Sequence, residues 1–104
     1  MTLRHIVLMR FPDGIDEDFL GRMDRAVVEM AKAIPEVQAS TGGRDVSSNP
    51  ENWHYAIIFD FADAPAYERY RVHPAHKQFI ADYMRGPKID KTRIQLTLPK
   101  GKSS

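Results

Sequence analysis

The chain has 104 residues and carries 15 Lys and Arg against 14 Asp and Glu, a formal net charge of +1. This length fits one domain, which we expect over residues 1–99, and the balanced charge gives no global attraction to nucleic acid or to an anionic membrane. The sequence has no cysteine, which excludes disulfides, a thiolate nucleophile and cysteine-based metal sites. No apolar run approaches the roughly 20 residues that cross a bilayer, so we expect neither a membrane nor a nucleic-acid partner.

The amino terminus begins directly on a strand-like pattern, without the apolar segment and cleavage site of a signal peptide. A cytoplasmic location is therefore the default expectation. At the other end, residues 100–104 are polar and are expected to form a disordered tail.

In chain order, the alternation over residues 3–11 predicts a strand with two part-apolar faces. A turn at residues 12–14 leads to a helix that Asp16 caps and that runs to about Ala33, because apolar residues recur there at three- and four-residue spacing. Pro35 ends this helix. A weaker strand over 37–46 follows, in which the pair Gly42-Gly43 suggests a bulge or a bend.

The strongest strand is predicted over residues 53–61, after a polar turn over 47–52. A short helix begins near residues 64–65 and breaks before Pro74, because a residue that precedes proline is pushed out of the helical region. A second helix runs from Pro74 to residues 86–87, and residues 92–98 alternate as a last strand.

This order of elements predicts an α+β fold of the ferredoxin-like βαββαβ type, a four-stranded antiparallel sheet with both helical layers on one face. The open face of the sheet is then too apolar to be left to solvent, since it carries Ile6, Leu8, Ala56 and Ile58. We therefore expect a homodimer in which two sheets pack face to face.

The best proton-transfer candidates gather in the segment His73-Pro74-Ala75-His76 and in Tyr70, six residues before His76. If the inward face of the sheet meets the helices, an apolar box forms in which His76 acts as a general base and Tyr70 donates to a substrate oxygen. The residues expected to line the box and bind substrate are His5, Val7, Met23, Val27, Tyr55 and Ile57.

Each candidate also has a structural interpretation. His73 is expected to cap the break before Pro74, His5 can be a core histidine bonded to a backbone carbonyl, and Tyr70 can serve packing alone. A metal site is disfavoured, because Pro74 occupies the first turn and Asp82 is the one suitably spaced carboxylate. The basic residues of the second half are interpreted as a solvated face, and no cofactor motif is present.

These residues resemble the stress-responsive dimeric α/β-barrel (Dabb) domain family. The resemblance covers nearly the whole chain, through the opening strand at His5, Ile34-Pro35, residues 43–46, Tyr70 and the segment 73–76. It implies a ferredoxin-like monomer, a dimer made by the sheets and a pocket between each sheet and its own helices. In a plant polyketide cyclase of this family, the second motif histidine is a base and the tyrosine supports the reacting oxygen, without a cofactor.

The resemblance assigns those two roles to His76 and Tyr70. The leading hypothesis is a cofactor-free cyclase, lyase or isomerase that moves a proton on a small oxo or phenolic compound. Two alternatives stay open, a non-catalytic ligand-binding or stress-associated protein and a cofactor-free oxygenase. This chain also departs from the cyclase, which has a pocket histidine at Tyr55 and an aromatic pair at Met23 and Asp24, so a different substrate is expected.

Overall fold

A computed structural model describes residues 2–85 and 88–99. The predicted tail over 100–104 and the predicted helix end at 86–87 lie outside these residues. The elements, in chain order, are β1 (Thr2–Arg10), α1 (Glu17–Ala33), β2 (Ala39–Arg44), β3 (Tyr55–Phe61), α2 (Ala64–Arg71), α3 (Pro74–Phe79), the π-helical turn η1 (Ile80–Met84) and β4 (Asp90–Leu98).

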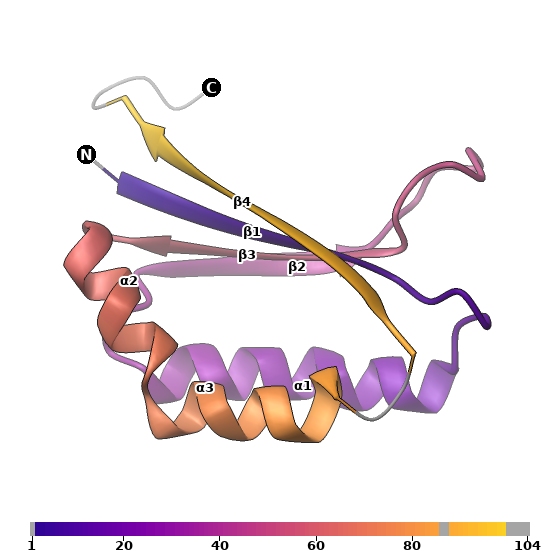
Figure 1. The fold of residues 1–104 in the computed structure, drawn as a ribbon, viewed down its shortest axis with the longest axis horizontal. Helices are drawn as coiled ribbons and strands as arrows, with labels where there is room; N and C mark the ends of the chain where they lie inside the picture. Colours follow the sequence, from indigo (N-terminus) through magenta and orange to yellow (C-terminus); the bar gives the residue numbers. More distant parts are fainter. Residues whose placement is uncertain (1, 86–87, 100–104) are drawn as a thin grey trace.

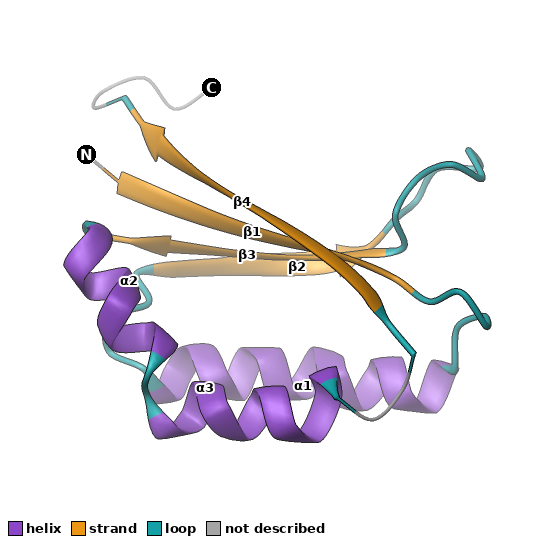
Figure 2. Cartoon of the chain, in the orientation of Figure 1, coloured by secondary structure: helices purple, strands orange, loops and turns teal. Residues whose placement is uncertain are grey.

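The four strands form one antiparallel sheet in the order β2-β3-β1-β4. The helices lie on one side of this sheet, with α1 running beside α3 and η1 (Figure 1). In the described part of the chain the opposite side carries no helix, as the colouring by element type makes clear (Figure 2). The prediction of a ferredoxin-like α+β fold is therefore confirmed.

The first helix begins and ends where its sequence predicts. The Asp16 carboxylate accepts the backbone N–H of Phe19 at 3.1 Å, and Ile34 forms the cap at the other end. One stripe of the helix is buried against the sheet, at three- and four-residue spacing: Leu20, Met23, Val27 and Met30. Removing this apolar stripe from water is the main contribution of α1 to stability.

The core lies between the helices and the inward face of β3. Along this strand the buried residues alternate with half-buried ones, and the buried set is Tyr55, Ile57, Phe59 and Phe61. In β1 the same inward face holds His5 and Met9. The predicted assignment of inward and outward faces is confirmed for these two central strands.

The strand ends differ from the prediction. β3 begins at Tyr55 rather than at Trp53. Next to this end, the His54 imidazole Nδ1 accepts the Phe11 N–H at 3.0 Å, and the His54 backbone N–H donates to the Met9 carbonyl at 2.8 Å. The Trp53 ring instead lies under the Arg10 guanidinium, 4.3 Å from its centroid. β2 is shorter than predicted and β4 starts two residues earlier.

The predicted bulge at Gly42-Gly43 is wrong, because pairing of β2 with β3 runs through both glycines without interruption. Gly42 instead permits a close approach of the two backbones. A Cβ atom built on Gly42 would lie 2.5 Å from the carbonyl oxygen of Ala56. The glycine is therefore required by space, not by a change of strand direction.

Replacing Gly42 by alanine should destabilise the protein by about 1–3 kcal/mol, the usual range for overpacking, because backbone atoms must move apart. The matched control is Gly21→Ala in α1, where the nearest atom to an added Cβ is the Arg25 side chain at 3.9 Å. That change should leave stability equal or raise it by about 0.5–1 kcal/mol. Urea unfolding measures both, and an unchanged midpoint for Gly42→Ala would contradict the steric argument.

Within the described residues, the core includes the polar side chain of His5, which has an exposed fraction of 6%. Its Nδ1 lies 3.1 Å from the Gln95 amide nitrogen on β4, and since an amide nitrogen can only donate, Nδ1 is the acceptor. Burial lowers the pKa of His5 to about 4, with further lowering from the charges of Arg93 and His76. His5 is therefore neutral in the native state near pH 7.

This lowered pKa predicts an acid-sensitive fold. The unfolded chain binds a proton at His5 near pH 6.5, whereas the native chain resists it until about pH 4. Stability should therefore fall as pH drops from 6.5 to 4, by at most about 3 kcal/mol from this group. The free energy of unfolding, measured across that range, should fall less steeply in His5→Gln, and parallel curves would count against the assignment.

Candidate functional site

A cavity of about 280 Å³ lies between the sheet and the second helical layer. It opens under α2, α3 and η1, and its wall includes the inward residues of β1, β3 and β4. The lining residues are His5, Val7, Met30, Ile57, Tyr67, Tyr70, Arg71, His76, Phe79, Ile80, Met84, Lys91 and Arg93. This set joins apolar surface to a few polar groups, which is the usual character of a small-molecule site.

The imidazole of His76 is oriented by the chain just before it. Its Nδ1 lies 3.0 Å from the carbonyl oxygen of Arg71, and because a carbonyl only accepts, Nδ1 carries the proton. Burial lowers the pKa of His76, and the charges of Arg71 and Arg93 lower it further, against the raising effect of the Arg71 carbonyl bond. The neutral ring therefore keeps an unprotonated Nε2, the form that a general base needs.

Tyr70 lies against this imidazole, with the two ring centroids 4.4 Å apart and the planes tilted by 46°. Its ring is held on the sheet by Phe61 and Phe59, at centroid distances of 4.9 and 5.7 Å. Burial raises the pKa of Tyr70 well above its ordinary value, with a smaller effect from Tyr67. The hydroxyl therefore stays protonated near pH 7 and can act as a hydrogen-bond donor.

His73 does not line the cavity. Its Nδ1 accepts the backbone N–H of Ala75 at 3.0 Å, and the residue forms the N-cap of α3. The prediction that His73 caps the break before Pro74 is confirmed. The two histidines of the segment thus have different positions, since His73 caps the N-terminus of α3 and His76 lines the cavity.

Five of the eight residues predicted from sequence share this cavity, namely His5, Val7, Ile57, Tyr70 and His76. The other three lie elsewhere. Met23 is fully buried in the core, and Val27 and Tyr55 line a separate groove beside β2. Tyr55 contacts Asp24 of α1 and does not line the cavity that Tyr70 of α2 lines.

The Tyr55 hydroxyl donates to a carboxylate oxygen of Asp24 on α1. Burial raises the pKa of Tyr55, and the bond to Asp24 raises it further. The hydroxyl that sequence reasoning assigned to a substrate therefore ties β3 to α1. Periodicity places Tyr55 on the inward face correctly, but it does not say which helix covers it.

Three cations at the cavity were not predicted as site residues: Arg71, Lys91 and Arg93. The sequence contained a signal for two of them. In β4 the polar side chains of Lys91, Arg93 and Gln95 occupy every second position. Strand pairing puts Arg93 beside Val7 and Gln95 beside His5, on the inward face. Polar residues on the inward side of a strand indicate a pocket rather than a core.

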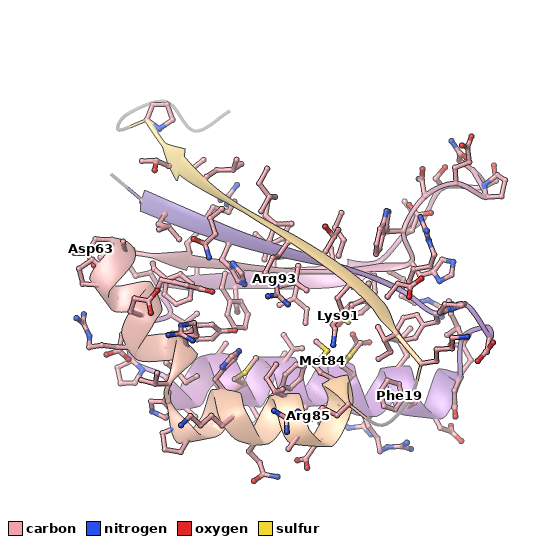
Figure 3. The ribbon with its side chains drawn as sticks, in the orientation of Figure 1. Phe19, Asp63, Met84, Arg85, Lys91 and Arg93 are labelled. Atoms are coloured by element: carbon pink, nitrogen blue, oxygen red, sulfur yellow. The ribbon has the colours of Figure 1, made fainter. Side chains whose placement is uncertain are left out.

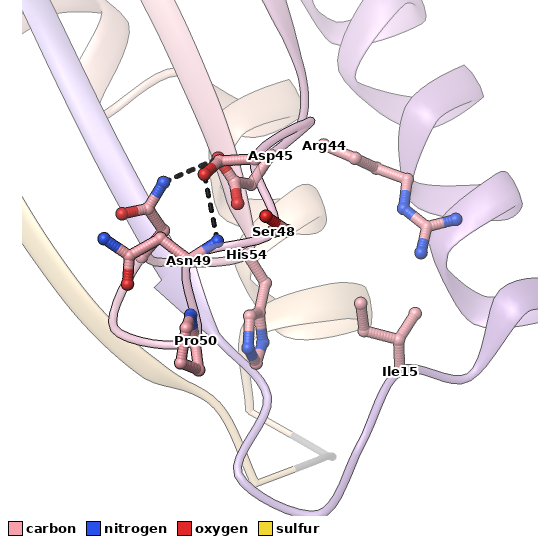
Figure 4. Close-up of a pocket in the computed structure, with 9 residues that line it drawn as sticks. Ile15, Arg44, Asp45, Ser48, Asn49, Pro50 and His54 are labelled. Atoms are coloured by element: carbon pink, nitrogen blue, oxygen red, sulfur yellow. Dashed lines mark hydrogen bonds between the residues drawn. The ribbon is translucent and has the colours of Figure 1, made fainter.

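A second hollow of about 250 Å³ lies beside the loop that joins β2 to β3 (Figure 4). Its polar groups bond to one another, as in the hydrogen bond from the Asn52 amide to the Asp45 carboxylate at 3.1 Å. The His54 ring in its wall stacks on Phe11 and accepts a backbone N–H, so its contacts are structural. This hollow offers no reactive group comparable to His76.

Within residues 2–85 and 88–99, no three His, Asp or Glu side chains are grouped so that they could hold a metal ion. The helices of this described part of the chain include none that is long and apolar enough to span a membrane.

Comparisons with known proteins agree with this architecture. The stress-response A/B barrel domain-containing protein HS1 of Arabidopsis thaliana is 26% identical over 84 residues, which cover 79% of this chain and 77% of that protein. Olivetolic acid cyclase of Cannabis sativa is 25% identical over 81 residues, 76% of this chain and 80% of the cyclase.

A dimeric ferredoxin-like protein of unknown function from Thermobifida fusca superposes with a TM-score of 0.83, at 26% identity. That match covers 94% of this chain and 92% of the other. The family model for the stress responsive A/B barrel domain matches residues 3–91, a range that includes His5, Tyr70 and His76 of the cavity. The chain therefore belongs to the stress-responsive A/B barrel domain family, abbreviated Dabb.

Proposed function

We propose that this protein is a cofactor-free enzyme that moves a proton on a small oxo or phenolic compound, in a reaction of the cyclase, lyase or isomerase type. His76 is the general base and Tyr70 is the hydrogen-bond donor. The similarity to olivetolic acid cyclase supports the reaction type at 25% identity. Other relatives of this fold, such as the Thermobifida fusca protein, have no known function, so the proposal rests on the cavity of this chain.

One observation carries the proposal, the bond from His76 Nδ1 to the Arg71 carbonyl. It fixes the tautomer and leaves the Nε2 lone pair available in a cavity that Tyr70 shares. When Nε2 takes a proton, the same carbonyl stabilises the imidazolium through Nδ1. A backbone carbonyl thus orients the base, a task often given to a carboxylate, without adding a negative charge to the site.

The chemical step follows from these two groups. Nε2 of His76 removes a proton from the carbon next to a substrate carbonyl, and the C–H electron pair forms a carbon–carbon double bond as charge moves to oxygen. The Tyr70 hydroxyl donates to that oxygen and keeps its own proton, because its pKa is raised by burial. The enolate then reacts, and the imidazolium returns its proton to the product.

Deuterium exchange tests this step with a simple ketone in place of the natural substrate. In D₂O the wild type should catalyse exchange at the methyl group of acetophenone, followed by proton NMR. His76→Ala should slow this exchange by about 10²–10⁴-fold, the usual contribution of a general base. Tyr70→Phe should slow it by about 10²–10³-fold, as expected for loss of one donor to a developing oxyanion.

The matched control is His73→Asn, which removes the other histidine of the segment but keeps a side chain that caps helices well. It should retain wild-type exchange. Circular dichroism and thermal unfolding confirm that each variant is folded. A wild type that binds small phenols or ketones but never exchanges their protons would favour the ligand-binding alternative, and equal rates in wild type and His76→Ala would contradict the role of His76.

We also propose that two copies of the chain pack through the open faces of their sheets. Ile6 on β1 pairs with Ile58 on β3 and with Ile94 on β4, so an apolar row crosses three strands. Ile94 and Leu96 are 55% and 40% exposed, and none of the described helices covers this side. An apolar patch that spans a sheet normally marks an interface, and the Thermobifida fusca relative is dimeric.

Light scattering at micromolar concentration should give twice the mass of the chain. Ile94→Lys places a charge in the centre of the row and should yield monomers, because a buried unpaired ammonium is strongly unfavourable. The control is Val28→Lys on α1, where the valine is 49% exposed, and it should remain dimeric. A monomeric wild type would remove the sheet-to-sheet proposal.

A further inference from the structure

The inward face of β4 carries charge where a core strand would carry apolar groups. Figure 3 shows the side chains of Arg93 and Lys91 extending from β4 toward the helices, with Lys91 reaching Met84. Both residues line the cavity that holds His76. Both residues are exposed to solvent, and their place on the helix side of the sheet also brings their charges to the edge of this cavity.

No carboxylate lines this cavity in the described parts of the chain. Of the three cations there, Arg71 is paired with Glu68 at 3.0 Å, and the Lys91 ammonium donates to the Met84 carbonyl at 3.1 Å, a neutral acceptor. Among residues 2–85 and 88–99, Arg93 forms no ion pair, although its guanidinium has five donors. The charges of Lys91 and Arg93 are therefore uncompensated.

The neighbouring imidazoles do not add charge of their own near pH 7, since both are neutral, and Arg93 contributes to the lowered pKa of each. The cavity thus has the positive charges of Lys91 and Arg93 at one side, together with two neutral imidazoles and the hydroxyl of Tyr70 as a hydrogen-bond donor. The remaining wall is apolar, formed by residues such as Val7, Ile57 and Phe79. A ligand that complements this cavity has an apolar part to contact the apolar wall and one anionic group to pair with the cations.

We infer that the site takes a small organic acid, with its carboxylate held by the Arg93 guanidinium and the Lys91 ammonium and its ring or chain on the apolar wall. This inference rests on the proposed function, because it names the substrate class of the same cavity. A carboxylate fits the flat fork of a guanidinium through two parallel hydrogen bonds, whereas a neutral ketone or phenol leaves that fork unused. The volume of about 280 Å³ restricts the acid to roughly the size of one ring with short substituents.

Comparing the affinities of an acid and of its amide, which have nearly the same shape, tests whether the site recognises a carboxylate. In isothermal titration at low salt, 2-hydroxybenzoate should bind the wild type at least about tenfold more tightly than 2-hydroxybenzamide, because a charge-assisted bond adds to the affinity of the acid alone. Arg93→Gln should weaken the acid about tenfold and leave the amide within about twofold, so that the preference disappears. Lys91→Gln should weaken the acid in the same direction.

Arg22→Gln is the control, since it removes the same charge from an exposed position on α1 away from the cavity. It should keep the wild-type preference. Equal affinities of acid and amide in the wild type, or a parallel loss of both in Arg93→Gln, would overturn the inference, as would the absence of acid binding at millimolar concentration.

The inference and the proposed function fail separately. Acid and amide that bind alike, together with deuterium exchange that still depends on His76, would remove the acid site and leave the proton transfer. An acid preference that depends on Arg93, without exchange of any ketone proton, would support the acid site and contradict catalysis.

Discussion

The conformational restriction that Pro74 places on His73 determines the geometry of the site. His73 is held in an extended conformation, at φ −66° and ψ 139°, so the chain leaves α2 and starts α3 in a new direction. The turn leaves the Arg71 carbonyl without a helical partner and within reach of the His76 ring. It also brings Tyr70 onto the same imidazole. One backbone restriction thus produces the tautomer, the donor and the position of the base.

The electrostatic character of the cavity depends on its cations and equally on the absence of a carboxylate among its described lining residues. A carboxylate beside His76 would raise the pKa of the imidazole and neutralise the cations of β4. The carbonyl of Arg71 orients the ring without either effect. Burial and the charge of Arg93 instead lower the pKa of both cavity histidines, so that the positive charge of the site comes from its arginine and lysine side chains and not from the imidazoles.

Local pattern was enough to predict much of this molecule. Alternation identified the inward face of β1 and β3, the cap at Asp16 and the break at Pro74 followed from local chemistry, and the order of elements fixed the sheet topology. What failed depends on packing between elements. The sequence cannot say that α1 rather than α3 covers Tyr55, or that Gly42 faces the Ala56 carbonyl. Lys91 and Arg93 are exposed, as predicted for a solvated face, but only the pairing of β4 with β1 shows that they also lie on the side of the cavity.

The strand that carries these cations lies at the edge of the sheet, where β4 pairs with β1 alone. Its nine residues leave one row of backbone groups unpaired, which is a template for strand addition and aggregation. Inward-pointing charge on an edge strand opposes such pairing, since a second strand would have to bury it. Lys91 and Arg93 therefore also oppose the addition of a foreign strand at this edge of the sheet. A variant with apolar residues at both positions would combine a long, apolar strand with an unpaired edge, and it would be prone to aggregation.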